Sequence, residues 1–313
     1  MMRNRNDVNG QIDEIPSIGS SFDSHSCFTD SHSYIKCSNS VLSHVLKVLM
    51  ILCSTIILAC GLHFFCRIFI ADRFSIPTQS MQPTLVPGDY VWVNKLIIGA
   101  RLYKSFDFEN RNLNCIRMPG IRNIQLGDVI CFNFPYGYDN LDRIEFRINN
   151  VYCKRVLGTP GDRIGVVDGH YWNDRNLKPI GVLQEQERLR WEYDSVFIWH
   201  GNYYVFPSAY TNWTIKNWGP LVVPQKGLSI ELNDSTRELY RKVIEYEMGN
   251  SLSDKMVSYT FLNNWYFAVG DNASYSYDSR YWGFIPEEFI IGIVGGSKVR
   301  NNPYKIYPSN AMQ

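Results

Sequence analysis

Alternating apolar and polar side chains predict that most of this chain folds as β-strands. Short runs of Val, Ile, Tyr, Phe and Trp are bounded by Gly, Pro, Asn or Asp, which is typical of half-buried strands joined by turns. The expected strands are 90–95, 128–134, 151–156, 163–167, 265–269 and 289–294. Asp168-Gly169 marks the tip of a hairpin. The fold class is therefore expected to be mainly β, with an antiparallel sheet as its core.

The segment from residue 170 to residue 262 has a different character. It is rich in Trp, Tyr and Asn, and it contains one good helix pattern. Ser235-Thr236-Arg237-Glu238 has the form of a capping box, and Leu239, Val243 and Ile244 follow at helical spacing. We interpret 170–262 as a smaller α/β subdomain inserted into the β core, which comprises 71–169 and 263–300.

A single long apolar run lies near the N-terminus. No Asp, Glu, Lys or Arg occurs from Val48 to Cys66, and this length nearly spans a hydrocarbon core of about 30 Å. We predict one transmembrane helix over 47–70, after a disordered polar tail over 1–46, and a C-terminal tail over 301–313. A cleaved secretory signal and a buried soluble helix are the alternatives. Positive charges flank the run on both sides, so charge does not decide its orientation.

Composition excludes some classes of function. The 313 residues carry a formal net charge of +1, which argues against a nucleic-acid surface. The eight cysteines show no spacing typical of a zinc or redox motif and are expected to be buried, small apolar side chains. The length suggests two domains or one large β domain.

The candidate chemistry begins with Ser80, which lies between Pro77 and Pro83 just after the apolar run. A hydroxyl needs a base to become a nucleophile. Strand alternation puts Lys154 on one face with Tyr152 and Val156, where burial would lower the lysine pKa and leave a neutral amine. An ordinary strand lysine with a solvated head is the alternative, and a Ser-His-Asp triad assembled in space also stays open.

A third segment, 270–283, supplies charges that could brace such a site. Buried charges must be paired. The plausible pairs are Asp271 with Arg155 and Asp278 with Arg280, and Ser276 could donate a hydrogen bond to the lysine nitrogen. The alternative is a surface loop rich in Asn and Ser.

These segments together resemble the bacterial type I signal peptidases, or leader peptidases, a family of Ser-Lys serine proteases. The shared motifs are Ser-Met-x-Pro-Thr-Leu, Pro-Gly-Asp-Tyr-Val, Lys-Arg-Val-x-Gly-x-Pro-Gly-Asp and Gly-Asp-Asn…Asp-Ser-Arg-x-Trp-Gly, in family order after an apolar span. The resemblance covers roughly 70–168 and 260–300. One departure is Ala273-Ser274-Tyr275, where family members often carry charge.

The resemblance implies a role for each matching residue. Ser80 would be the nucleophile and Lys154 the general base. The Ser80 N–H and the Thr78 hydroxyl would form the oxyanion hole. Ser276, Asp271, Arg155, Asp278 and Arg280 would orient the lysine and brace the site. The substrate pockets would be lined by Ile76, Met81, Leu85 and Cys153, although core packing is an equal alternative for Leu85 and Cys153.

The resemblance also implies substrate, partners and location. A membrane-bound endopeptidase would cut signal peptides from exported preproteins after small-x-small motifs, without cofactor or metal. It would be a single-pass protein of the bacterial inner membrane with its catalytic domain on the periplasmic side, in contact with the lipid bilayer, and the secretion translocon is a further candidate partner. One alternative is a dedicated processing peptidase for one exported or conjugation-related protein. Another is a non-catalytic membrane-anchored protein that binds exported peptides.

Overall fold

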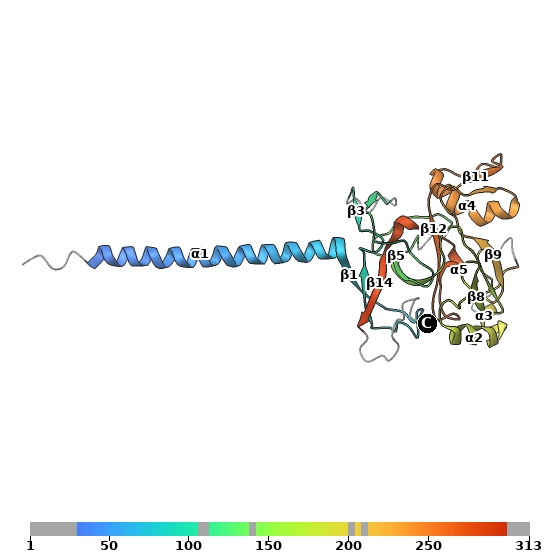
Figure 1. The fold of residues 1–313 in the computed structure, drawn as a ribbon, viewed down its shortest axis with the longest axis horizontal. Coiled ribbons are helices and arrows are strands. Elements are labelled where there is room, and N and C mark those ends of the chain that lie inside the picture. The colour runs from blue at the N-terminus through green and yellow to red at the C-terminus, as the bar shows by residue number, and fades with distance from the viewer. Residues whose placement is uncertain (1–29, 106–112, 138–141, 200–203, 208–211, 299–313) are drawn as a thin grey trace, which may run out of the picture. The chain divides into compact units, whose positions relative to one another are not determined.

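The structure, a computed structural model, describes residues 30–105, 113–137, 142–199, 204–207 and 212–298 (Figure 1). The chain divides into two compact units, residues 1–61 and residues 62–313. Each unit is described by itself below. The predicted C-terminal tail, 301–313, and most of the predicted N-terminal tail lie outside the described residues.

The N-terminal part of the described chain is one long helix, α1 (Asp30–Phe65), followed by a π-helical turn, η1 (Cys66–Ile70). Leu42–Ile70 has a mean hydropathy of 2.4 over its most apolar window, and none of that window is buried. This helical segment is long and apolar enough to cross a membrane. The helix begins at Asp30, and its apolar segment begins at Leu42, before the predicted boundary at residue 47, because Leu42, Val45 and Leu46 extend the apolar pattern toward the N-terminus.

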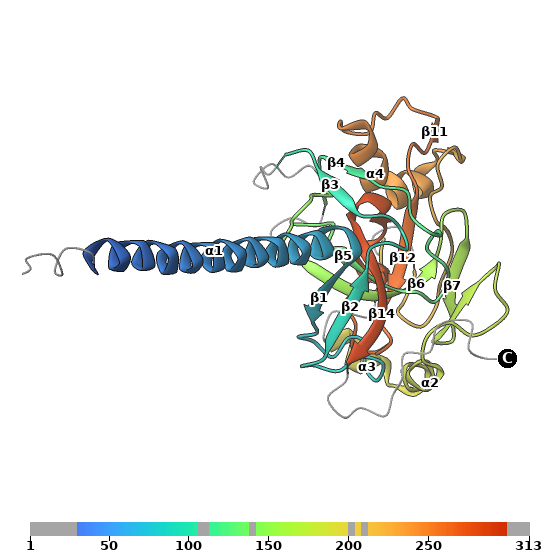
Figure 2. The same cartoon turned by 60° about the vertical axis from the view of Figure 1, so that its left-hand side comes forward.

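A seven-stranded sheet organises residues 62–313, in the order β1-β2-β14-β5-β6-β12-β13 (Figures 1 and 2). Every pair of neighbours in it is antiparallel. Its strands are β1 (Ala71–Ser75), β2 (Tyr90–Asn94), β5 (Val129–Asn133), β6 (Val151–Gly158), β12 (Trp265–Val269), β13 (Ile285–Pro286) and β14 (Ile290–Lys298). The predicted class, mainly antiparallel β, is confirmed.

Smaller elements complete the unit. They are the sheets β8-β7-β9, β10-β11 and β3-β4, four helices and one 3₁₀ turn. The bounds are β3 (Arg101–Tyr103), β4 (Cys115–Arg117), β7 (Arg163–Val167), β8 (His170–Asn173), β9 (Trp218–Val222), β10 (Ser229–Glu231), β11 (Ser258–Thr260), α2 (Leu183–Trp191), α3 (Asp194–Trp199), α4 (Asp234–Met248), α5 (Ser279–Trp282) and η2 (Glu287–Phe289). In both views α2 and α3 lie at one end of the unit, and α4 lies at the other (Figures 1 and 2).

The β7–β8 hairpin turns where the sequence predicts. Asp168 has φ 50° and Gly169 has φ 79°, and Val167 faces His170 across the hairpin. Two consecutive positive φ angles are what a two-residue type I′ turn requires. Turn chemistry therefore sets the register of this hairpin.

Two hydrophobic clusters lie on opposite faces of β5 and β6. Alternation sends Ile130, Phe132 and Val156 into the larger cluster. Cys131 joins the smaller cluster, which also contains Ile76, Met81 and Leu85, with the partly buried Cys153 packed against it. The sheet thus separates a large core from a small one, and the small one lies beside the Ser80 segment.

The 170–262 insertion packs into the large core. The Trp218 ring lies 5.3 Å from that of Phe267, and Tyr240 stacks on Phe284 at 5.8 Å. β7, from the predicted core, pairs with both β8 and β9 of the insertion. Because side chains of the insertion and of the β core are buried together, residues 62–313 form one compact unit. The limits 170 and 262 of the insertion therefore stay a prediction.

Helix α4 begins two residues earlier than its predicted capping box. Asn233 is the N-cap: its side chain accepts a hydrogen bond from the Thr236 N–H at 3.0 Å, and the Thr236 hydroxyl accepts one from the Asn233 N–H at 2.9 Å. Ser235 is already inside the helix. The sequence pattern pointed to Ser235 and Glu238, but Asn and Thr fill the same roles.

The capping assignment can be tested by substitution. Asn233→Ala should lower the free energy of unfolding by about 1 kcal/mol, because the Thr236 N–H in the first turn of α4 loses its side-chain acceptor. Ser235→Ala, an exposed position in the same turn, should change it by much less. Chemical denaturation of the full chain in detergent measures both. A larger loss for Ser235→Ala would contradict the observed cap.

Candidate active site

A cleft of about 700 Å³ opens between the Ser80 segment and strand β6. Phe74 to Met81 form one wall, and Val151 to Lys154 form the other. The remaining lining residues are Cys131, Ile148, Asn149, Tyr275 and Tyr277. Ser80 and Lys154 both face this cleft, so it contains the two residues that the sequence indicates as candidate nucleophile and base.

The loop between β1 and β2 holds Ser80 in place. The Ile76 N–H donates to the Asp89 carbonyl at 2.9 Å, and the Gly88 N–H donates to the Ile76 carbonyl at 2.9 Å. Met81 and Leu85 are fully buried in the small cluster. The buried side chains of Met81 and Leu85 therefore fix the loop to the protein, while Ser80 stays partly exposed at the cleft.

Lys154 lies in β6 with only 3% of its surface exposed, and its Nζ is hydrogen-bonded to Ser80 Oγ. Burial lowers the pKa of Lys154, because desolvation penalises the ammonium form. The negative charges of Asp278 and Asp271 raise that pKa, and the positive charge of Arg280 lowers it. Desolvation outweighs the carboxylates, which favours a neutral amine next to the serine hydroxyl.

The two predicted ion pairs are both present behind Lys154. Arg155 Nε and Nη2 donate to the two oxygens of Asp271 at 2.6 and 2.7 Å, and Thr84 Oγ1 also donates to Asp271. Asp271 is almost completely buried. This bidentate pair joins β6 to the loop that follows β12.

Arg280 and Asp278 form the second pair, and both side chains are completely buried. Arg280 Nε and Nη2 each donate to Asp278 at 2.8 Å, and the Gly270 N–H donates to Asp278 at 2.9 Å. Burial alone would raise the pKa of Asp278, but Arg280 and the Gly270 amide hold it below its usual value. Asp278 therefore remains a fixed negative charge near Lys154.

Ser276 lies close to the dyad but does not bond to it. Its hydroxyl is buried and has no hydrogen-bond partner, so the predicted bond to Lys154 is not formed in this structure. A Cβ on Gly270 would come 2.1 Å from Ser276 Oγ and 2.4 Å from the Ser80 carbonyl oxygen. Only glycine at residue 270 lets Ser276 and Ser80 approach so closely.

The predicted oxyanion donors lie on the nucleophile loop. Thr78 Oγ1 is 3.3 Å from Ser80 Oγ. Within the described part of the chain, the Ser80 N–H donates to no protein acceptor. Both groups are thus available at the cleft for an oxygen bound next to Ser80.

The predicted pocket residues divide into two groups. Ile76, Met81 and Cys153 line the cleft. Leu85 does not line it and packs in the small core, which is the alternative noted for that residue. The prediction missed Cys131 and Val151, although strand pairing places both beside Cys153 on the same face.

Asn272 is a third residue that the sequence prediction missed. It is 4% exposed, and its Nδ2 donates to the Gln79 carbonyl at 3.1 Å. Its backbone N–H donates to the Ser80 carbonyl at 3.1 Å. Its place directly after Asp271 in a predicted site segment was the signal that could have found it.

Strand β6 presents an open edge to the cleft. β5 pairs with residues 151–155, whereas β12 pairs with β6 only from Arg155 to Gly158. In the described part of the chain, no strand pairs with the other side of Val151 to Lys154. An extended peptide in the cleft could lie along this edge of the sheet as an added strand.

Among the described residues, no histidine lines this cleft. His170 bonds to the Asp168 carbonyl and to Glu187 on the surface, both at 3.0 Å. His200 lies outside the described residues. The residues in the described ranges contain no group of three His, Cys, Asp or Glu side chains placed to hold a metal ion.

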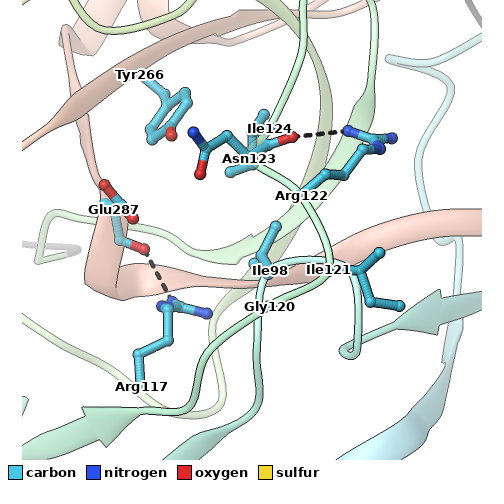
Figure 3. A pocket seen from close by; sticks show the side chains of 9 residues that line it. All are labelled: Ile98, Arg117, Gly120, Ile121, Arg122, Asn123, Ile124, Tyr266 and Glu287. Carbon is cyan, nitrogen blue, oxygen red and sulfur yellow. Dashed lines mark hydrogen bonds between the residues drawn. The ribbon is translucent and has the colours of Figure 1, made fainter.

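A second cavity, of about 330 Å³, is lined by Arg117, Arg122 and Glu287 among others (Figure 3). Arg117 donates to the Glu287 carbonyl and Arg122 to the Asn123 carbonyl, as Figure 3 shows. Arg122 also forms a bidentate pair with Asp128. The guanidinium groups that line this second cavity already have hydrogen-bond partners, and no serine or lysine is among its lining residues. The Ser80 cleft is therefore the candidate site for the predicted serine–lysine chemistry.

The chain is similar to several curated bacterial proteins. It is 28% identical over 260 residues to signal peptidase I of Buchnera aphidicola subsp. Baizongia pistaciae, covering 74% of this chain and 70% of that protein. It is 26% identical over 229 residues to signal peptidase I of Aquifex aeolicus, with 73% and 75% covered. It is 28% identical over 236 residues to signal peptidase I of Pseudomonas aeruginosa, with 72% and 64% covered.

A solved structure and a family match complete the comparison. A signal peptidase I from Enterococcus faecalis V583 covers 56% of this chain and 99% of its own, with 18% identity and a TM-score of 0.28. The model of the family "Signal peptidase, peptidase S26" matches residues 49–296, well over half of the chain. The chain therefore belongs to the signal peptidase family, peptidase S26.

Proposed function

We propose that this protein is a membrane-anchored serine endopeptidase that removes signal peptides from exported preproteins after small-x-small motifs. The single observation that carries the proposal is the hydrogen bond between Ser80 Oγ and the buried Nζ of Lys154. Family membership supports a peptidase that processes signal peptides. The geometry supports the identity of its nucleophile and base.

The first half of the reaction uses the neutral amine. Lys154 accepts the proton of the Ser80 hydroxyl while Ser80 Oγ attacks the scissile carbonyl carbon. The carbonyl oxygen gains negative charge, which the Ser80 N–H and the Thr78 hydroxyl are placed to stabilise. Protonated Lys154 then gives its proton to the leaving amine, and an acyl-enzyme ester remains on Ser80.

The second half releases the signal peptide. Neutral Lys154 takes a proton from a water molecule as that water attacks the ester carbon. The tetrahedral intermediate collapses, the C–O bond to Ser80 breaks, and the proton returns to Ser80 Oγ. The buried carboxylates of Asp271 and Asp278 are each paired to an arginine, so neither competes with Lys154 for the proton.

Substrate recognition follows from the open edge of β6. A preprotein strand pairing with Val151 to Lys154 would alternate its side chains between the two faces of the added strand. On one face lie Ile76, Met81 and Cys153, whose apolar surfaces suit small side chains such as alanine. Tyr275 and Tyr277 also line the cleft, and such bulky side chains would suit the alternative of a dedicated peptidase for one exported substrate.

The apolar helix motivates the membrane part of the proposal. Leu42–Ile70 would anchor the protein once in the bacterial inner membrane, with the catalytic residues on the periplasmic side. Ser80 follows the span closely in sequence, so the site would work near the bilayer surface, where a signal peptide and the translocon are found. The predicted division into anchor, catalytic core and insertion belongs to the same proposal.

The dyad is tested with the full-length protein in detergent and a preprotein that carries an Ala-x-Ala site. Ser80→Ala and Lys154→Ala should each lower kcat by about 10³-fold or more, because each removes one member of a unit that acts together. Ser258→Ala and Lys95→Ala, a surface serine and another partly buried lysine, should retain activity. Cleavage by both dyad variants would refute the mechanism, and tight binding without cleavage by the wild type would favour the peptide-binding alternative.

The lowered pKa of Lys154 predicts the pH dependence of cleavage. Only the neutral amine is a base, so kcat/KM should rise with pH through the lysine pKa and level off above it. Because burial lowers this pKa, the midpoint should lie below 10.5, the ordinary value for lysine. Initial rates from pH 5 to about 10.5 measure it. A midpoint at or above the ordinary lysine value would show that the Lys154 amine is not desolvated in the working enzyme.

A further inference from the structure

Helix α2 of the insertion touches the loop that carries Asp271 and Asn272. We propose that Arg188, on α2, is a positioning residue that orients the Ser80 peptide through Asn272. Arg188 Nη2 donates to Asn272 Oδ1 at 3.0 Å. Asn272 Nδ2 in turn donates to the Gln79 carbonyl at 3.1 Å. The insertion is thereby linked to the nucleophile loop by two consecutive hydrogen bonds.

The geometry of a peptide unit explains why the Gln79 carbonyl matters. The Gln79 C=O and the Ser80 N–H belong to one planar trans peptide, so they point in opposite directions. Holding the carbonyl with Asn272 therefore directs the Ser80 N–H away from Asn272. The Asn272 backbone N–H also holds the Ser80 carbonyl at 3.1 Å, so both peptide units that flank Ser80 Cα are restrained.

Arg188 decides which way the Asn272 amide faces. An asparagine amide has a donor end and an acceptor end that differ little in size, whereas a guanidinium group can only donate. With Arg188 against Oδ1, the NH₂ end must face the Gln79 carbonyl. Without Arg188 the amide gains a second orientation, in which its oxygen would face the carbonyl oxygen of Gln79 and the restraint would be lost.

Further contacts hold α2 against the same loop. The Arg188 guanidinium lies 5.2 Å from the centre of the Tyr275 ring, and the Tyr275 hydroxyl donates to Glu192 at 3.3 Å. Glu185 pairs with Arg188 Nη1 at 3.0 Å, one turn earlier in α2. Residues 273–275 carry no charge of their own, so the insertion supplies the charged group that braces this loop.

The consequence for catalysis is specific. A misdirected Ser80 N–H weakens stabilisation of the oxyanion, which forms only in the transition state. Arg188→Ala should therefore lower kcat by about tenfold, less than loss of an oxyanion donor itself, and leave KM within about twofold. Arg188→Lys keeps a donor and should recover part of the loss.

The helix itself provides the matched control. Arg190 also lies on α2, pairs with Asp168 at 2.7 Å and stacks on Trp191 at 5.0 Å, and among the described residues no hydrogen bond, ion pair or ring contact joins it to the loop. Arg190→Ala should leave kcat unchanged. Asn272→Asp keeps a partner for Arg188 but cannot donate to Gln79, so it should lower kcat as much as Arg188→Ala does. The double variant Arg188→Ala/Asn272→Asp should lose no more than either single variant.

Because this inference rests on the proposed function, it also needs a measurement that does not depend on activity. Hydrogen exchange at the Asn272 amide should speed up in Arg188→Ala and not in Arg190→Ala. Faster exchange with inactive wild-type protein would reject the peptidase proposal alone. Unchanged exchange, equal effects of Arg188→Ala and Arg190→Ala on kcat, or additive losses in the double variant would each reject the positioning role.

A separate observation concerns two cysteines in the wall of the cleft. Cys131 of β5 faces Cys153 of β6 directly in the antiparallel register. The Val156 N–H donates to the Asp128 carbonyl at 2.9 Å and the Phe134 N–H to the Asn150 carbonyl at 2.7 Å, on either side of this pair. Hydrogen-bonded pairs alternate along such a ladder, so Cys131 and Cys153 occupy a non-hydrogen-bonded pair.

In such pairs the Cα atoms are about 4.5 Å apart, which lies within the range that a disulfide bridges. The side chains point to the same face, into the small cluster, and both line the cleft. We infer that Cys131 and Cys153 form a dithiol site that reacts with small disulfides and thereby controls access of substrate side chains. This site lies directly next to Lys154 and against Ile76 and Met81.

The reaction balances as a thiol–disulfide exchange. The partly exposed Cys153, as a thiolate, attacks one sulfur of a small disulfide and releases one thiol. Cys131 then attacks Cys153 Sγ of the mixed disulfide, loses its proton, and releases the second thiol. Two cysteine thiols are oxidised to one disulfide while the small disulfide is reduced to two thiols. The new bond draws the two sulfurs together and changes the shape of the apolar wall.

The experiment treats the full-length protein in detergent with glutathione disulfide. Peptide mass mapping should find residues 131 and 153 joined, with two hydrogen atoms lost. Cleavage of the Ala-x-Ala preprotein should fall by about tenfold, the scale of a small misfit in an apolar subsite, and dithiothreitol should restore it. Cys115→Ser, a free cysteine elsewhere, should behave as wild type, and Cys131→Ser should stop at the mixed disulfide on Cys153, with one glutathione added and no joined peptide pair.

Mapping and activity separate the possible failures. A joined peptide pair in a protein that never cleaves the preprotein would reject the proposed function and keep the dithiol reaction. Absence of the joined pair, or full activity of the joined form, would refute the inferred control of the cleft.

Discussion

Desolvation of the Lys154 amine is the constraint on which the rest of the active site depends. A lysine that stays solvated is protonated near neutral pH and cannot accept the Ser80 proton. Lys154 escapes this because both the large core and the Ser80 loop cover it, leaving 3% of its surface exposed. The nearby carboxylates of Asp271 and Asp278 raise the pKa of Lys154 and so oppose desolvation. Each carboxylate is paired with an arginine, whose positive charge offsets its influence on the lysine.

The sheet makes this burial possible by separating two environments. Side chains of β5 and β6 alternate between a large aromatic core and a small cluster under the nucleophile loop. The small cluster anchors Met81 and Leu85, which brings Ser80 to the amine. The open edge of β6 beyond Arg155 leaves room for a peptide at the same place. The positions of the proposed nucleophile, the proposed base and the proposed substrate edge are thus consequences of one strand arrangement.

Several contacts at the site come from parts of the chain that carry no recognisable chemistry. The insertion packs Trp218 and Tyr240 into the common core and extends Arg188 to Asn272. Asn272 then restrains the peptide units around Ser80. Residues 273–275 carry no charge, and the charged side chain that braces their loop is Arg188 of α2. A loop can be braced in this way by any neighbouring element that offers a hydrogen-bond donor.

The sequence by itself predicted five of the seven strands of the core sheet, the β7–β8 turn, the apolar helix and the candidate residues Ser80 and Lys154 with their paired charges, and it missed β1 and β13. Each of these rests on local periodicity or on residue types that stay close in sequence or in a known motif. Tertiary structure decided what depends on distant packing. It capped α4 at Asn233, placed Leu85 in the core, left the Ser276 hydroxyl unbonded and joined Arg188 to Asn272. Such contacts join segments far apart in the chain, and no local pattern records which side chains the folded core brings together.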